Sequence, residues 1–334
     1  MDPFDENSSL HDDVSAVSDF LVRVGLEGPS AVTLSEVEEF QRLSGSASLQ
    51  TVPRLAAQLS ATAGSLRGFL SSGDATSLVA VMELTLDCYY SCRAVKTWLQ
   101  GKFTDLPALE ELFGQTRPGR VEETLTGVEF IEVGYESNTT AEGKRTDANY
   151  LLELASGEVL VDRVEAVATA WQPSMRKVSW QNRLLVQTVQ VSPGFAPRRV
   201  KLSGLRFQPL DRADLERASA YAKGTITDLH KDYRTFRSNF FAPERMPALL
   251  IPKGFYVDGE TAYLVDKAGH MVLLGERPSS VYLRDPFFHA LAAGASSLVF
   301  GHLVPAGSQL MLAVLGALGV GSSGQIVRYP GYND

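Results

Sequence analysis

The chain has 334 residues, of which 44% are hydrophobic and 21% charged, and its formal net charge is −8. This much apolar material is enough for two or three packed cores, and it excludes wholesale disorder, a collagen-like repeat and a disulfide scaffold. The overall negative charge also argues against a general polyanion-binding protein.

Compartment signals point to the cytoplasm. Residues 1–10 are acidic and polar, without the basic start and apolar run of a secretory signal. Cys88 and Cys92 stand four residues apart, a spacing that does not suit a disulfide within one helix. Residues 286–327 carry no Asp, Glu, Lys or Arg, but glycines and prolines interrupt them, so we expect buried strands and no membrane span.

The first 115 residues carry apolar side chains at every third or fourth position, which is typical of amphipathic helices. Thr33 to Glu36 forms a capping-box pattern, while Pro53 and Gly73 bracket a further helix. Because such helices cannot bury their stripes singly, we predict a helical bundle. The segment holds 16 acidic and 7 basic side chains, a net charge of −9.

From about Thr116 the pattern changes to that of strands, and it contains an internal repeat. Residues 150–161 align with residues 263–274 with one deletion, each a hairpin around a glycine turn. A further strand begins thirty-four residues after Leu151 in the first copy and after Leu264 in the second. The alternative is that two unrelated hairpins share common β residues by chance.

Each copy provides five strands with a helix-compatible segment, 163–171 or 286–293, between the third and the fourth. This is the order of an OB-fold, a small Greek-key barrel. We therefore predict an α+β protein in which a helical bundle precedes two small antiparallel β-barrel (OB-like) units joined by a helix. The expected boundaries are 1–115 for the acidic bundle, 116–210 for the first unit, 211–243 for the linker helix, 244–320 for the second unit and 321–334 for a C-terminal tail.

The second unit contains an apolar strand, a Leu-Val-Asp-x-x-Gly hairpin and a later Val-x-Gly strand. This pattern resembles the closing segment of bacterial SWIM zinc-finger proteins. The resemblance implies membership of a bacterial multi-component system, but it brings no zinc site, because the paired cysteines and the Cys-x-His of that family are absent. The residues that match are Leu264, Val265, Asp266, Gly269, Val299 and Gly301.

Catalytic and cofactor motifs are incomplete. Gly319 to Gly324 fits GxGxxG, but only ten residues follow, too few for the helix that would hold a pyrophosphate. Ser174 to Lys177 fits SxxK without the companion elements of a serine enzyme. Cys88 and Cys92 lie on an apolar stripe, where cysteine acts as a small hydrophobe. We predict no catalytic, cofactor or metal site.

Residues 174–237 hold 5 acidic and 13 basic side chains, a net charge of +8. Cations combined with aromatic rings are the composition that single-strand binders use. Strand alternation places Val200, Leu202 and Leu205 inward and leaves a basic outer face that could equally meet an acidic protein surface. The candidate binding residues are Arg176, Lys177, Trp180, Arg183, Phe195, Arg198, Arg199, Lys201 and Arg206.

The leading hypothesis is a non-enzymatic adaptor or scaffold subunit of a bacterial multi-protein system, which acts through protein–protein contacts. The alternative is single-stranded nucleic-acid binding through the basic face of the first unit. A third hypothesis is an enzyme whose site residues are dispersed in the sequence. The pattern leaves the partner and the oligomeric state open.

Overall fold

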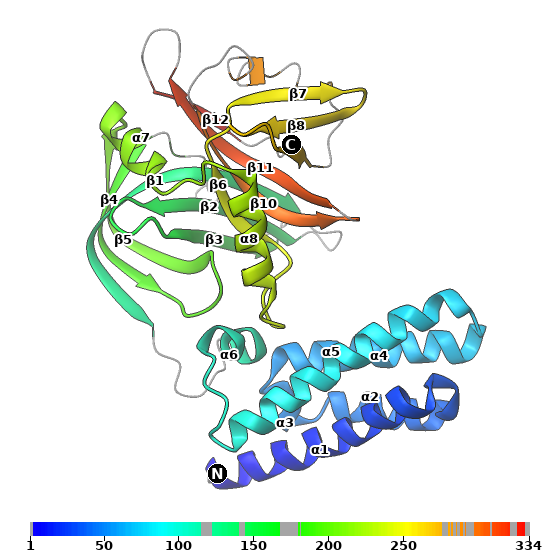
Figure 1. The fold of residues 1–334 in the computed structure, drawn as a ribbon. Coiled ribbons are helices and arrows are strands. Elements are labelled where there is room, and N and C mark those ends of the chain that lie inside the picture. The colour runs from blue at the N-terminus through cyan, green and yellow to red at the C-terminus, as the bar shows by residue number, and fades with distance from the viewer. Residues whose placement is uncertain are drawn as a thin grey trace. The chain divides into compact units, whose positions relative to one another are not determined.

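The chain divides into two compact units, Met1–Arg120 and Val121–Asp334 (Figure 1). The computed structural model describes residues 3–114, 122–139, 144–167, 180, 182–275, 297–307, 309–320 and 326–330, with single positions between 280 and 291. The predicted order of helices followed by two sheets is confirmed. Within the described residues, no helix combines the length and the hydropathy that a membrane crossing requires.

The first unit is helical. The predicted capping box is present, because Thr33 accepts from the Glu36 amide and the Glu36 side chain accepts from the Thr33 amide. Gly73 ends its helix in the left-handed conformation, as a C-terminal glycine does. Cys88 and Cys92 are buried and unbridged. The helices are α1 Pro3–Glu27, η1 Pro29–Ala31, α2 Leu34–Ser44, α3 Ala47–Gln50, α4 Pro53–Ser72, α5 Ala75–Leu99 and α6 Leu106–Phe113.

The next five strands close into a barrel in the order β1-β2-β3-β5-β4. The prediction of an antiparallel sheet is wrong in one place, because β3 and β5 pair in parallel. Phe130, Leu151, Leu160 and Leu184 fill the interior. The strands are β1 Glu123–Thr139, β2 Lys144–Glu153, β3 Val159–Val167, β4 Asn182–Val191 and β5 Arg198–Pro209.

Two segments that were predicted as helices differ in the structure. Residues 163–167 belong to β3 and are not helical, and residues 168–171 lie outside the described residues. The linker forms two helices, α7 Arg212–Ser219 and α8 Ile226–Arg237, because Asp211 and Thr225 each cap a separate N-terminus.

The second sheet has the order β6-β10-β11-β9-β8-β7, with β12 paired to β11. The predicted second barrel is therefore an open sheet. Residues 248–256, whose pattern predicts one continuous first strand, are broken at residues 251–253, where Pro252 has no N–H to donate. Residues 326–330, expected in a tail, form β12. The strands are β6 Met246–Leu250, β7 Gly254–Asp258, β8 Thr261–Val265, β9 Met271–Leu274, β10 Ser297–Ala306, β11 Gln309–Val320 and β12 Ile326–Pro330.

The two sheets share one pattern of strand pairing. In the barrel, β1 pairs with both β2 and β4, and β3 lies parallel to β5. In the second sheet, β6 and β7 together correspond to β1. The pairing of β6 with β10 corresponds to that of β1 with β4, and the pairing of β7 with β8 corresponds to that of β1 with β2. The parallel pair is β9 with β11. The repeat in the sequence thus corresponds to a repeat in topology.

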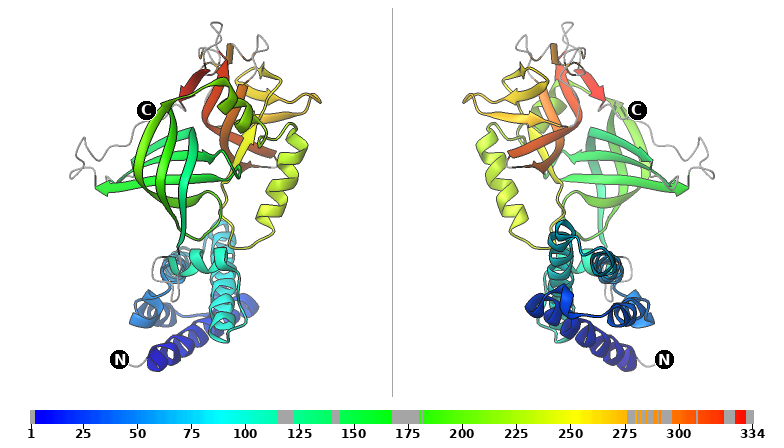
Figure 2. Two further views of the ribbon diagram at one scale, coloured as in Figure 1. Left: turned by 90° about the vertical axis from the view of Figure 1, so that its left-hand side faces the viewer. Right: turned by 90° about the vertical axis from the view of Figure 1, so that its right-hand side faces the viewer.

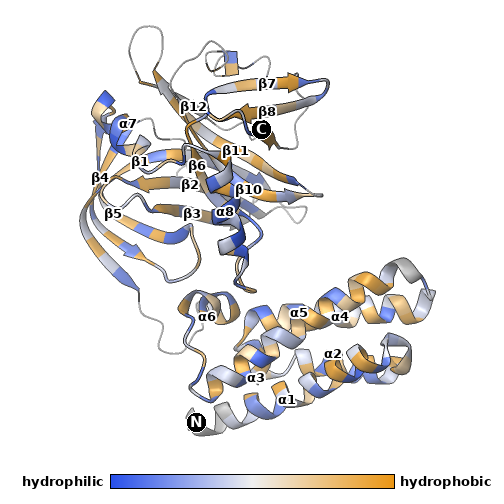
Figure 3. Ribbon diagram, in the orientation of Figure 1, coloured by the Kyte–Doolittle hydropathy of each residue, from blue (hydrophilic) through white to orange (hydrophobic). Residues whose placement is uncertain are grey.

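The barrel and the second sheet pack side by side through a shared hydrophobic cluster (Figure 2). Ile131, Tyr150 and Leu152 on the outer face of β1 and β2 meet Phe300 and Leu315 on β10 and β11. The strands of both sheets carry hydrophobic residues interleaved with hydrophilic ones, whereas α7 and α8 are more hydrophilic (Figure 3).

Two glycines allow this close approach. A Cβ on Gly316 would lie 2.3 Å from the Val133 carbonyl oxygen and 2.9 Å from the Gly134 Cα. A Cβ on Gly134 would lie 2.5 Å from the Phe300 ring. The contact at Gly316 involves backbone atoms, which cannot rotate away, so the two sheets would have to separate to admit a methyl group.

Replacing Gly316 by alanine should therefore lower the free energy of unfolding by about 2 kcal/mol or more, since overpacking forces the backbone apart. Gly254→Ala is the matched control, because no atom lies within 4 Å of its added Cβ, and it should change stability by less than about 0.5 kcal/mol. Urea denaturation of both variants measures the difference. Equal stability of the two variants would contradict the close backbone approach.

His302 on β10 is buried in the same contact. Its ring lies 5.1 Å from the ring of Tyr150, and its Nδ1 has no hydrogen-bond partner among the described residues. Burial lowers the pKa of His302 to about 4, a shift that Glu136 opposes and Arg245 reinforces. The folded protein therefore holds this imidazole neutral.

The lowered pKa makes the contact sensitive to acid. Between about pH 6.5 and pH 4 the unfolded chain binds a proton that the folded chain does not, so stability should fall by about 3 kcal/mol as the pH is lowered through this window. His302→Leu removes the titrating group, so the free energy of unfolding of this variant should fall less than that of the wild type over the same pH window. Urea denaturation at both ends of the window tests this expectation, and identical pH dependence in the two proteins would contradict it.

Candidate ligand-binding groove

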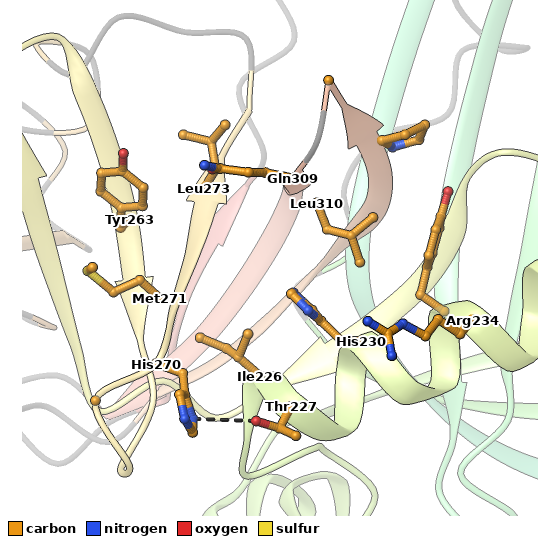
Figure 4. Close-up of a pocket in the computed structure, with 14 residues that line it drawn as sticks. Ile226, Thr227, His230, Arg234, Tyr263, His270, Met271, Leu273, Gln309 and Leu310 are labelled. Carbon is orange, nitrogen blue, oxygen red and sulfur yellow. Dashed lines mark hydrogen bonds between the residues drawn. The ribbon is translucent and has the colours of Figure 1, made fainter.

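An open groove of about 830 Å³ is lined by residues of α8, of β8 and β9, and of the start of β11 (Figure 4). Tyr263, Met271 and Leu273 come from the strands, and His230 and Arg234 come from the helix. Pro305 near the end of β10, Gly307 in the β10–β11 turn and Gln309 at the start of β11 border it further. Its volume lies within the range of ligand sites in proteins.

The sheet face that borders the groove at Tyr263 and Leu273 is apolar where a solvent-facing sheet is normally polar. Tyr256 pairs with Tyr263, Tyr263 with Leu273, and Leu273 with Met311, so these side chains share one face across four strands. The opposite face carries the buried core, including Leu264, Val272 and Leu274. The rings of Tyr256 and Tyr263 lie 6.3 Å apart, and the Tyr256 side chain is 50% exposed. This face is therefore an accessible aromatic and apolar platform.

The helical wall supplies the polar groups. His230, Tyr233 and Arg234 follow one another at positions i, i+3 and i+4 of α8, and this spacing places them on one side of the helix. Neither His230 nor Arg234 has a hydrogen bond or ion pair with another described residue. Among the described lining residues there is no Asp or Glu. The groove therefore favours an anionic group near the helix.

Asp266 joins the two walls. This buried carboxylate accepts hydrogen bonds from the Ile226 amide at the start of α8 and from the amides of Ala268 and His270 in the β8–β9 turn, at 2.8, 2.8 and 2.9 Å. Its Oδ2 also lies 3.3 Å from the His270 ring. Burial by itself raises the pKa of Asp266, but the backbone donors outweigh it and leave the pKa lowered.

The structure places most predicted site residues elsewhere, on the barrel, and pairs three of its arginines internally. Arg198 binds Glu158 through two hydrogen bonds of 2.6 and 2.7 Å and reaches Glu123 at 2.9 Å. The bonds to Glu158 raise the pKa of Arg198. Arg183 donates to Asp214 at 3.0 Å and also to Gln208, and Arg199 lies 3.5 Å from Glu165.

The other predicted residues are dispersed. Lys201 and Arg206 are exposed and have no ion pair with another described residue. Phe195 packs against Phe236 of α8, with ring centroids 5.9 Å apart, and Trp180 packs against Phe207 at 6.1 Å. Arg176 and Lys177 lie outside the described residues. Val200 is buried as predicted, but Leu205 is 38% exposed and not inward-packed.

The second sheet also covers the outer face of the barrel at β2. Ala148, Tyr150 and Leu152 alternate on this face, and all three are buried against the second sheet. In the second sheet the corresponding hairpin, β8–β9, is uncovered along the groove. Sequence reasoning missed this site because it followed total positive charge. The available signal was the run of outward apolar residues in two short strands.

Neither a metal centre nor a reactive thiol emerges from the described residues. They contain no group of three or more His, Cys, Asp or Glu side chains arranged to hold a metal ion. Burial raises the pKa of Cys88 to about 12, and burial also raises that of Cys92. A thiol that stays protonated at neutral pH is a poor nucleophile.

No protein-family model matches the chain, and no curated protein matches it. Among solved structures, the chain is similar to one described as "Structure and Conformational Change of a Replication Protein A Heterotrimer Bound to ssDNA", with 11% sequence identity and a TM-score of 0.28. The match covers 65% of this chain and 51% of the other, so the chain spans about half the length of that protein.

Because Asp266 holds both walls, Asp266→Ala should lower the free energy of unfolding by about 3 kcal/mol at neutral pH, since buried amides lose their acceptor. The stabilisation is present above the ordinary aspartate pKa of about 4 and disappears as the pH falls through the lowered pKa of the folded state. Asp258→Ala, at an exposed turn, is the control. Urea denaturation measures both, and equal stabilities would contradict the anchoring role.

Proposed function

We propose that the chain is a non-enzymatic binding protein that takes up single-stranded nucleic acid in the groove between α8 and the second sheet. The observation that carries this proposal is that Tyr263 and apolar side chains lie beside Arg234 and His230, with no carboxylate among the described lining residues. Bases stack on aromatic side chains, and cations bind the phosphates beside them.

The strand order supports the same assignment. We assign both sheets to the OB-type topology, in which five strands form a Greek-key barrel and oligonucleotides bind at the face of strands two and three. In the second sheet, β8 and β9 hold these two positions, and the β10–β11 turn is the loop between strands four and five. The groove lies at this face and is bordered by this turn.

The energetics of stacking suit the groove. Each base stacked on an aromatic side chain contributes about 1–3 kcal/mol, so Tyr263 in the groove can hold one base, and Tyr256, beside it on the same sheet face, can hold a second. Arg234 adds a phosphate contact whose strength falls with salt. The net charge of −8 does not prevent this, because binding follows the local potential, and the described lining of the groove carries Arg234 and no carboxylate.

The barrel is the weaker candidate for this function. Its β2 face is buried by the second sheet, and Arg183, Arg198 and Arg199 are neutralised by carboxylates of the same unit. A phosphate would have to displace these ion pairs. Only Lys201 and Arg206 among the described candidate cations remain without an ion pair to another described residue.

The adaptor function stays a prediction, and one observation on the helical unit favours it. Exposed large apolar side chains occur there on several helices, including Leu26, Leu34, Val79, Leu86 and Leu106. Such side chains gather at protein–protein contacts when they form a contiguous patch.

A labelled oligothymidine of about 15 nucleotides should bind with an affinity that falls steeply between about 50 and about 200 mM NaCl. Arg234→Glu and Tyr263→Ala should each weaken binding about 10-fold, because one removes a phosphate contact and the other a stacking surface. Fluorescence anisotropy measures the dissociation constants.

Arg206→Glu is the matched control, since it reverses an exposed cation on the barrel and leaves the groove intact. It should leave affinity within about 2-fold of the wild type. Loss of binding in Arg206→Glu with full binding in Arg234→Glu would move the site to the barrel. Absence of binding at low salt would overturn the proposal.

A further inference from the structure

Helix α5 of the first unit carries two apolar stripes on opposite sides. Val81, Thr85, Cys88, Cys92 and Val95 are buried and face the bundle. At 100° per residue, the side chains that lie opposite them belong to Val79, Met82, Leu86 and Tyr90. A surface helix of a globular protein normally has a single apolar stripe.

The second stripe is accessible within the helical unit. Val79 is 62% exposed, Leu86 52% and Tyr90 39%, and Met82 is half-buried. The four positions follow one another at steps of three, four and four residues and so form a continuous line over three helical turns. This is the length over which an amphipathic helix docks through side chains at i, i+3, i+4 and i+7.

One side of the stripe is acidic, and Arg93 follows Tyr90 at its C-terminal end. Glu83 and Asp87 lie along one side of it, and residues 1–115 as a whole carry a net charge of −9. A basic partner gains favourable electrostatics at this surface, whereas an acidic one meets like charge. The charge of the unit therefore selects among the helices that would fit the apolar stripe.

We propose that the outer stripe of α5 is the docking surface for an amphipathic helix of a partner protein, whose apolar side chains are bordered by Lys and Arg. This inference does not depend on the nucleic-acid groove, because its residues all belong to the helical unit. It gives the adaptor hypothesis a surface and a partner chemistry.

The test uses the full chain and two labelled helical peptides of about 18 residues, with leucine at i, i+3, i+4 and i+7 and either lysine or glutamate elsewhere. The lysine peptide should bind at least about 10-fold more tightly than the glutamate peptide. Leu86→Asp should weaken binding of the lysine peptide about 10-fold or more, since it places a charge in the apolar contact.

Leu26→Asp is the matched control, because Leu26 is 82% exposed at the end of α1 and is not part of the stripe. It should leave the affinity unchanged, and circular dichroism of both variants should match that of the wild type. Equal loss in the two variants, equal binding of the two peptides, or no binding would overturn the proposal. A wild-type dimer that Leu86→Asp converts to a monomer in sedimentation would instead identify a second copy as the occupant, which also overturns it.

Discussion

The close packing of the barrel against the second sheet is the constraint on which the rest of the β unit depends. Gly316 lets β11 approach the backbone of β1 at Val133 and Gly134. This approach buries the outer residues of β2, so the hairpin that repeats in both sheets has one covered and one open version. A site can therefore form on the second sheet, while the same region of the barrel serves the interface.

A single buried carboxylate then sets the geometry of the open face. Asp266 accepts from the first amide of α8 and from two amides of the β8–β9 turn. Helix α8 is bonded to one oxygen of this carboxylate and the β8–β9 turn to the other, so His230 and Arg234 hold a defined position relative to Tyr263. Rigid support of this kind reduces the entropy lost when a flexible single strand is ordered on the surface.

Features that depend on residues close together in the sequence could be predicted from it. The capping box at Thr33, the turn at Gly157 and the repeated hairpins are local patterns, and all are present. Long-range pairing was not predictable in this way. Arg198 appeared to be a free cation because its partners, Glu158 and Glu123, stand 40 and 75 positions away in the sequence. The basic block consequently seemed more available than it is.

The groove was hidden for the same reason, since α8 and the β8–β9 hairpin are separate in the sequence. The amide of Ile226 and the carboxylate of Asp266 are 40 residues apart, and only folding brings them together. A better signal than charge was the breach of alternation, because Tyr263 and Leu273 occupy outward positions of an exposed sheet. Removing apolar side chains from water is favourable, so an apolar solvated face gains free energy when something covers it. The outer stripe of α5 breaks the one-stripe rule of surface helices in the same way.

Both departures, at the groove and on α5, concern surfaces that intramolecular packing leaves apolar and that the described part of each unit does not cover. They are therefore better guides to what the chain binds than its net charge, which is a sum over many residues that neutralise one another.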